Sequence, residues 1–198
     1  MAEDIRICFV GDSFINGTGD ETALGWAGRL CASANASGVA VTYYNLGIRR
    51  NTSKDILFRW ESECAIRLPD SCDGRIVISC GVNDTVIENG SVRVTQEDSI
   101  NNIRKILDGA NKYNVIMVGP PPIDDDEQNK RIKAISEAYE REANMFNVPF
   151  IDLYSSLIND NEYKIEVSKN DGAHPQSNGY SKIADIVSSS PSWWFNEP

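Results

Sequence analysis

Short runs of consecutive apolar residues alternate along the chain with longer segments in which apolar residues recur every three or four positions. The short runs have the length and β-branched content of buried strands, and they cover residues 5–10, 39–45, 75–80, 115–119 and 150–153. The longer segments have the period of amphipathic helices, and they cover residues 24–34, 53–68, 96–112, 128–146 and 177–188. This alternation predicts a three-layer α/β/α fold, with a five-stranded parallel sheet between two layers of helices.

The chain has 198 residues and contains no internal repeat, low-complexity tract or Pro- or Ser-rich linker. We therefore expect residues 1–198 to form a single domain. The formal net charge of −10 would repel a phosphate backbone, which argues against nucleic-acid binding. No apolar run approaches the ~20 residues of a membrane span. Because Glu3 and Asp4 have the wrong charge for a secretory leader, we expect a cytoplasmic protein.

The five cysteines are consistent with a reducing compartment. Their number is odd, none belongs to a Cys-x-x-Cys pair, and Cys8 and Cys80 lie inside predicted strands. We expect buried free thiols, although the sequence neither supports nor excludes a Cys64–Cys72 disulfide.

Segments that combine glycine with polar side chains follow three of the predicted strands, and a fourth precedes the last helix. They are residues 11–14, 45–47, 81–84 and 171–175. In open parallel sheets, ligands bind beyond the carboxyl ends of the strands. We therefore expect these segments to meet at one edge of the sheet and to form the functional site.

His174 is the only histidine in the chain. Imidazole is the side chain best suited to take up and return a proton near pH 7. Asp171, three residues earlier, could hold the ring in one tautomer and stabilise the imidazolium. Considered alone, His174 could equally be a surface or capping residue in the loop that enters the last helix.

Ser13 supplies a nucleophile at the exit of the first strand, where a tight turn and nearby helix N–H groups favour negative charge. Its hydroxyl needs a base within hydrogen-bond reach. The amide of Asn83 and the backbone N–H groups of Gly47 and Ser13 are then candidates for an oxyanion hole. Taken singly, Ser13 could be a helix cap, and Gly47 and Asn83 could be turn formers.

Together these segments resemble the GDSL family of esterases and lipases, also called SGNH hydrolases. The family's blocks occur in the family's order: Gly11-Asp12-Ser13, Asn45-x-Gly47, Gly81-x-Asn83-Asp84 and Asp171-x-x-His174. The resemblance spans nearly the whole chain and implies a flavodoxin-like sheet without metal or cofactor.

The resemblance also implies roles for individual residues. Ser13 would be the nucleophile, His174 the base and Asp171 its orienting acid. Ser13 N–H, Gly47 N–H and Asn83 would form the oxyanion hole. A small-molecule ester would then be hydrolysed through an acyl-enzyme. The motifs do not specify which ester is the substrate.

The chain departs from the family's usual pattern at two places. Phe14 replaces the leucine that usually follows Gly-Asp-Ser, which is an exchange of one apolar residue for another. Arg50 belongs to an Arg49-Arg50 pair where small residues are frequent in the family. Arg50 either lines the cleft and attracts an anionic group or is a solvated loop residue.

Other residues near the blocks have structural expectations. Asp12 and Asp84 should hold their loops by side-chain to backbone hydrogen bonds. Pro121, in the proline run after the fourth strand, forms either a wall of the acyl pocket or an ordinary loop. The acidic run 124–127 should cap the next helix rather than bind a metal. Residues 193–195 (Trp-Trp-Phe) should pack onto the domain, with a homodimer contact or a cleft cover as alternatives.

Three other hypotheses compete with the serine esterase. A flavodoxin-like module could bind a nucleotide or flavin through the Gly-rich segment 11–19, but that segment has no phosphate-loop consensus and Asn83 would be left without a role. A family member without catalysis could bind acyl or sugar ligands, although no motif residue is missing. An ordinary α/β-hydrolase is disfavoured because no serine lies in a Gly-x-Ser-x-Gly sequence.

Overall fold

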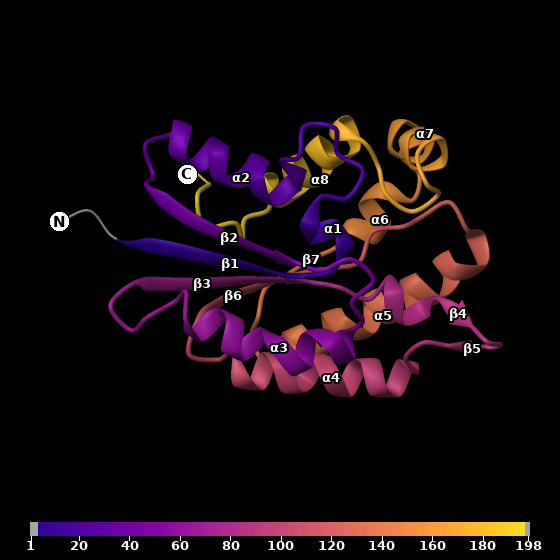
Figure 1. The fold of residues 1–198 in the computed structure, drawn as a ribbon, viewed down its shortest axis with the longest axis horizontal. Helices are drawn as coiled ribbons and strands as arrows, with labels where there is room; N and C mark the ends of the chain where they lie inside the picture. The colour runs from indigo at the N-terminus through magenta and orange to yellow at the C-terminus, as the bar shows by residue number, and fades with distance from the viewer. Residues whose placement is uncertain (1–3, 197–198) are drawn as a thin grey trace.

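The computed structural model describes residues 4–196, and the predicted five-stranded parallel sheet lies at its centre (Figure 1). The strands lie in the order β2-β1-β3-β6-β7, which is the flavodoxin-like order. The loops after β1 and β3 therefore lie at the switch point where open sheets bind ligands. The strands are β1 Ile5–Gly11, β2 Val41–Gly47, β3 Asp73–Ser79, β6 Asn114–Val118 and β7 Phe150–Ile151.

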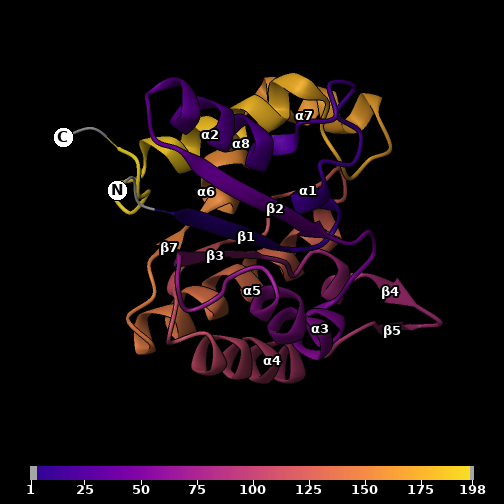
Figure 2. The ribbon, with the colours of Figure 1, turned by 60° about the vertical axis from the view of Figure 1, so that its left-hand side comes forward.

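Helices cover both faces of this sheet (Figures 1 and 2). Helices α2 and α8 lie side by side on one face, and α6 and α7 continue this layer toward the carboxyl ends of the strands. Helices α3, α4 and α5 lie on the other face. Their bounds are α2 Gly25–Ala36, α3 Ser53–Ala65, α4 Gln96–Gly109, α5 Asp126–Met145, α6 Leu153–Leu157, α7 Asn161–Lys169 and α8 Ser177–Ser189. The predicted three-layer architecture is confirmed.

The central strands contain continuous apolar runs because both of their faces are buried. In β1, Ile7 and Phe9 pack into the cluster under α2 and α8, whereas Cys8 and Val10 pack into the cluster under α3, α4 and α5. The same alternation holds along β3 and β6. A one-residue slip of β1 would exchange these two sets between the faces, so the two cores fix the register of the strand.

Local capping sets where several helices begin. Thr52 and Asp55 form a capping box at the start of α3, with reciprocal bonds between side chain and backbone. The acidic run acts as predicted, because Asp125 accepts the N–H of Gln128 at 2.8 Å and α5 begins at Asp126.

The apolar pattern of the sequence did not predict several short elements. They are α1 (Ser13–Asn16), a 3₁₀ turn (Asn83–Thr85), the hairpin of β4 (Ile87–Glu88) and β5 (Ser91–Val92), and helices α6 and α7. Each spans too few residues for an apolar period to stand out. Conversely, α3 ends at Ala65 rather than at residue 68. The Arg67 N–H bonds Cys64 O with the three-residue spacing of a turn, and Pro69 prevents the helix from continuing.

The described C-terminal residues pack back onto the domain. Trp193 is buried in the α2/α8 core, and the Arg75 guanidinium lies 5.3 Å from the ring centroid of Trp194 and 5.1 Å from that of Phe195. Arg75 belongs to the amino-terminal half of β3, at the opposite end of the sheet from Ser13 (Figure 1). This position rules out the cleft-cover interpretation of the tail.

All five cysteines are free thiols in the structure, so residues 64 and 72 are not bridged. Between residues 4 and 196, no helix combines the length and the apolar character needed to cross a bilayer.

Candidate active site

Ser13 is the first residue of α1, immediately beyond the carboxyl end of β1. Glycine is required at the end of β1, because a Cβ on Gly11 would lie 2.1 Å from the carbonyl oxygen of Ser79 on the neighbouring strand. Asp12 caps α1 and accepts the N–H of Phe14 at 2.9 Å. As a result, the Ser13 side chain is held at the switch point, and the residue is only 5% exposed.

His174 reaches the same point from the loop between α7 and α8. Its Nε2 atom lies 2.7 Å from Ser13 Oγ, and its Nδ1 atom lies 2.7 Å from Asp171 Oδ2. The imidazole therefore bridges a hydroxyl and a carboxylate, one on each ring nitrogen. With Asp171 on Nδ1, the tautomer protonated at Nδ1 leaves Nε2 free to accept the Ser13 proton.

The Asp171 carboxylate is fixed by its own loop. Its Oδ1 atom accepts the backbone N–H of Ala173 at 3.0 Å and that of His174 at 2.8 Å. Burial alone would raise the pKa of Asp171, but these bonds and the imidazole outweigh burial and lower the pKa. The carboxylate is thus ionised at neutral pH and faces the ring that would become cationic.

The ring of Phe14 packs on the imidazole, with the two centroids 4.9 Å apart. Both rings are buried. Phe14 therefore limits how far His174 can swing away from Ser13, in addition to the bonds on its two nitrogens.

Two of the proposed oxyanion donors, Gly47 N–H and the Asn83 amide, already have acceptors inside the protein. Gly47 N–H donates to Asn45 Oδ1 at 3.0 Å. The Asn83 amide donates to Asp12 Oδ2 at 3.2 Å and to the carbonyl oxygen of Asn51 at 3.1 Å. An arriving substrate oxygen would exchange for one of these acceptors.

Packing also excludes a side chain at Gly47. A Cβ at this position would lie 2.2 Å from the backbone nitrogen of Asn16 and 2.7 Å from the carbonyl oxygen of Asp12. The end of β2 therefore lies directly against α1, which is the helix that carries Ser13. The lack of a side chain at Gly47 thus lets the end of β2 pack against α1.

Two buried carboxylates lie beneath the site. Burial raises the pKa of Asp12 to about 7, despite the opposing bond from Phe14 N–H. Burial also raises the pKa of Asp84. Asp84 accepts Ser53 N–H at 2.8 Å and the hydroxyl of Ser99 at 2.5 Å, which ties the loop after β3 to the starts of α3 and α4.

Arg50 forms no hydrogen bond with Ser13, Asp171 or His174 in the described structure. Arg50 is exposed, has a left-handed backbone (φ 65°) and forms an ion pair with Glu88 of β4. Its charge is therefore partly neutralised by the hairpin. Pro121 is a buried residue of the loop after β6.

The glycines of segment 11–19 have packing roles. Gly17 lies against Gly25, and a Cβ on Gly19 would lie 3.0 Å from the carbonyl oxygen of Pro175. The segment is thus folded against the His174 loop, an arrangement that accounts for its glycines without a phosphate ligand. In residues 4–196, no group of three or more His, Cys, Asp or Glu side chains could hold a metal ion.

Sequence reasoning missed polar residues that hold two loops of the structure: Asn170 in the His174 loop, and Asp20 in the loop between α1 and α2. The Asn170 side-chain amide donates to the carbonyl oxygen of His174 at 3.0 Å. Asp20 is buried and accepts bonds from Thr22, Gly25 and Arg29. These polar residues lie in irregular segments, and their one sequence signal, nearness to the motif blocks, does not say which contacts they make.

Comparison with family models gives a match over most of the chain. A family model described as the GDSL-like Lipase/Acylhydrolase family matches residues 9–182. A search of curated proteins gives no match.

Several solved structures share the fold. A lipase/acylhydrolase from Enterococcus faecalis has a TM-score of 0.76 at 24% identity, over 92% of this chain and 93% of that one. A catalytic mutant of an acetylxylan esterase from Geobacillus stearothermophilus has a TM-score of 0.80 at 17% identity, over 99% and 97%. A member of the lipolytic protein G-D-S-L family from Veillonella parvula has a TM-score of 0.74 at 22% identity, over 92% and 94%.

Proposed function

Because the chain belongs to the GDSL-like lipase/acylhydrolase family and is an ester hydrolase, we propose that it cleaves carboxylic esters through a covalent acyl-enzyme on Ser13. One observation carries this proposal: His174 Nε2 lies 2.7 Å from Ser13 Oγ while Nδ1 of the same ring lies 2.7 Å from Asp171. A serine hydroxyl is a weak nucleophile until a base takes its proton. The chain's sole histidine is that base.

The reaction proceeds in two steps. His174 takes the Ser13 proton as Oγ attacks the acyl carbonyl, and the protonated ring then gives this proton to the departing alcohol oxygen as the C–O bond breaks. A water molecule, deprotonated by the same imidazole, then attacks the acyl carbon. The bond to Ser13 Oγ breaks, the imidazolium returns its proton to Oγ, and the acid is released. Asp171 stabilises the imidazolium in both steps without being protonated itself.

The oxyanion that forms in each step needs donors fixed in advance. We propose the backbone N–H groups of Ser13 and Gly47 together with the Asn83 amide. Support comes from the packing of Gly47 against α1, the helix that begins at Ser13, and from the hydrogen bond that ties Asn83 to Asp12, the residue before Ser13.

The substrate class that we propose is a short-chain ester. Ser13 and His174 are 5% and 8% exposed, and such limited access suits a small acyl group better than a long alkyl chain. A structural neighbour is named as an acetylxylan esterase, so acetylated sugars are the first natural substrates to test. We also propose that residues 1–198 act as one hydrolase domain.

Covalent labelling tests the proposal directly. A fluorophosphonate should modify one residue, and peptide mass spectrometry should locate the adduct on Ser13. The Ser13→Ala variant should take up no label and should not hydrolyse p-nitrophenyl acetate, while its melting temperature stays near that of the wild type. A folded wild-type protein that neither labels nor hydrolyses short esters would instead support the non-catalytic binding hypothesis.

A further inference from the structure

Helix α8 begins three residues after His174, and its first turn is capped by no side chain of its own. Gln176 occupies the N-cap position, yet its side chain makes no capping hydrogen bond. The first N–H groups of a helix have no partner within the helix, so a helix that starts this way tends to fray unless other groups bind its end. Fraying here would move the segment that fixes His174.

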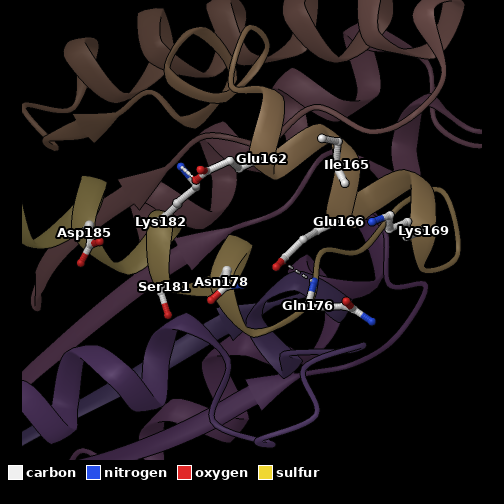
Figure 3. Close-up of a pocket in the computed structure, with 9 residues that line it drawn as sticks. All are labelled: Glu162, Ile165, Glu166, Lys169, Gln176, Asn178, Ser181, Lys182 and Asp185. Atoms are coloured by element: carbon white, nitrogen blue, oxygen red, sulfur yellow. Dashed lines mark hydrogen bonds and ion pairs between the residues drawn. The ribbon is translucent and has the colours of Figure 1, made fainter.

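Glu166, from the last turns of α7, supplies the missing acceptor. Its Oε2 atom accepts the N–H of Gln176 at 3.0 Å and the N–H of Gly179 at 2.7 Å. Figure 3 shows the Glu166 side chain directed toward Gln176, in a groove of about 670 Å³ between α7 and α8. A Cβ on Gly179 would lie 3.1 Å from Oε2, so glycine lets the carboxylate reach the backbone closely.

Glu21 supplies a second acceptor from a different part of the chain. It lies in the loop between α1 and α2, and it accepts both the N–H of Ser177 (3.1 Å) and the Ser177 hydroxyl. The bond from that hydroxyl holds the pKa of Glu21 below its usual range, so this group is charged at neutral pH. Because α1 begins at Ser13, Glu21 links the helix of the nucleophile to the helix that follows the base.

We propose that Glu21 and Glu166 are positioning residues for catalysis. Together they form what we call the α8 clamp, and it holds the start of α8 so that His174 stays in contact with Ser13. This inference rests on the proposed function. Two negative charges at the positive end of a helix dipole add a favourable electrostatic interaction to the hydrogen bonds.

The clamp acts on the transition state more than on substrate binding. Neither carboxylate contacts Ser13 or the proposed oxyanion donors in the structure. Loss of a clamp residue lets the imidazole drift, and misplacement of a catalytic group by about 1 Å can cost on the order of 100-fold in rate. We therefore expect kcat to fall while KM stays nearly constant.

The decisive comparison is between Glu166→Ala and Glu162→Ala. Both residues lie on α7, one turn apart, and both contact α8. Glu162, however, forms an ion pair with Lys182 at 3.0 Å, away from the helix start. We expect Glu166→Ala to lower kcat for p-nitrophenyl acetate about tenfold, whereas Glu162→Ala should leave it unchanged. Glu166→Gln should retain most of the activity, because its amide oxygen can accept the same two N–H groups.

The single histidine provides a readout that a purely structural role would not move. Its imidazole signals in an NMR spectrum need no assignment. In folded Glu166→Ala these signals should broaden or double relative to the wild type, and in Glu162→Ala they should not. Equal losses of kcat in the two alanine variants, or an unchanged kcat and imidazole spectrum in Glu166→Ala, would overturn the proposal.

Further variants distinguish failure of the clamp from failure to fold and from failure of the proposed function. If Glu166→Ala does not fold, Glu21→Ala replaces an exposed loop residue and should show the same fall in kcat, with recovery in Glu21→Gln. Ser13→Ala, assayed alongside, isolates the proposed function. Turnover in that variant would refute the serine mechanism, whereas an inactive Ser13→Ala with fully active clamp variants would refute the clamp alone.

Discussion

The carboxylate of Asp171 contacts His174 twice, through Oδ2 to the ring Nδ1 atom at 2.7 Å and through Oδ1 to the backbone N–H at 2.8 Å. One acid therefore fixes both the position of the loop and the tautomer of the ring. Ser13, on the other side of the ring, is 161 residues away in sequence. The His174 ring is thus oriented by contacts within its own loop, independently of its contact with Ser13.

Replacing Asp171 with asparagine should separate the effect of its negative charge on the imidazole from its role in holding the loop backbone. The side-chain oxygen of the introduced asparagine can still accept backbone N–H groups, but its amide N–H₂ would face Nδ1 and favour the wrong tautomer. We expect kcat to fall on the order of 10³- to 10⁴-fold, with KM changed much less. Steady-state assays with p-nitrophenyl acetate measure both constants. Asp70→Asn, in an exposed turn, is the control; activity in Asp171→Asn within tenfold of the wild type would contradict the assigned role.

Asn83→Ala should remove one oxyanion donor. The loss of such a donor typically costs about 3 kcal/mol of transition-state stabilisation, or on the order of 100-fold in kcat. The Ser13–His174 contact does not involve Asn83, so fluorophosphonate labelling of Ser13 should continue, at a reduced rate. Circular dichroism checks that the variant is folded. A kcat unchanged by the substitution would exclude Asn83 from the oxyanion hole.

The strands and the motif blocks could be predicted because they depend on local sequence. A strand buried on both faces is apolar at every position, as β1 is from Ile7 to Val10. Parallel strands bring their carboxyl ends to one edge, which is why Ser13 and Asn83 could be expected together. The contact of His174 with Ser13 followed from the same logic and from its being the sole histidine.

The features that could not be predicted from the sequence depend on contacts between distant segments. Glu21 meets Ser177 across 156 positions, and no periodicity or spacing marks that pair. Arg50 could be either a cleft residue or a solvated one in sequence, and only the unpredicted β4–β5 hairpin supplies its partner Glu88. Short helices such as α6 and α7 carry too few residues for their pattern to be distinguished from a loop.

Asp20 should make stability depend on pH at the acidic end. Burial alone would raise its pKa, but bonds from Arg29, Thr22 and Gly25 outweigh burial and lower the pKa to about 2. The folded state therefore binds fewer protons at this group than the unfolded chain, whose pKa is near 3.8. Ionised Asp20 stabilises the folded state by about 2 kcal/mol above roughly pH 4, and this contribution is lost as the pH falls to about 2.

Urea unfolding of the wild type and of Asp20→Asn, followed by tryptophan fluorescence, measures that contribution. The difference in unfolding free energy between the two should be largest near neutral pH and should shrink as the pH approaches about 2. Asp108→Asn, an exposed position on α4, should show no such trend. A difference that stays constant over the acidic range would mean that the Asp20 carboxylate is not the titrating group.

Gly47→Ala should disturb the site through α1. The added methyl group would lie 2.2 Å from the Asn16 nitrogen, which belongs to backbone and cannot move aside alone. Either β2 or α1 must shift, at a cost of about 1–3 kcal/mol, and a shift of α1 displaces Ser13 from His174. We expect a lower melting temperature together with a fall in kcat of at least tenfold. Gly38→Ala is the matched control, because its left-handed backbone (φ 90°) makes alanine unfavourable by about 1 kcal/mol while a Cβ there meets no atom within 4 Å. If Gly38→Ala lowered kcat as much as Gly47→Ala at equal loss of stability, the fall would reflect stability rather than the packing of α1 against β2.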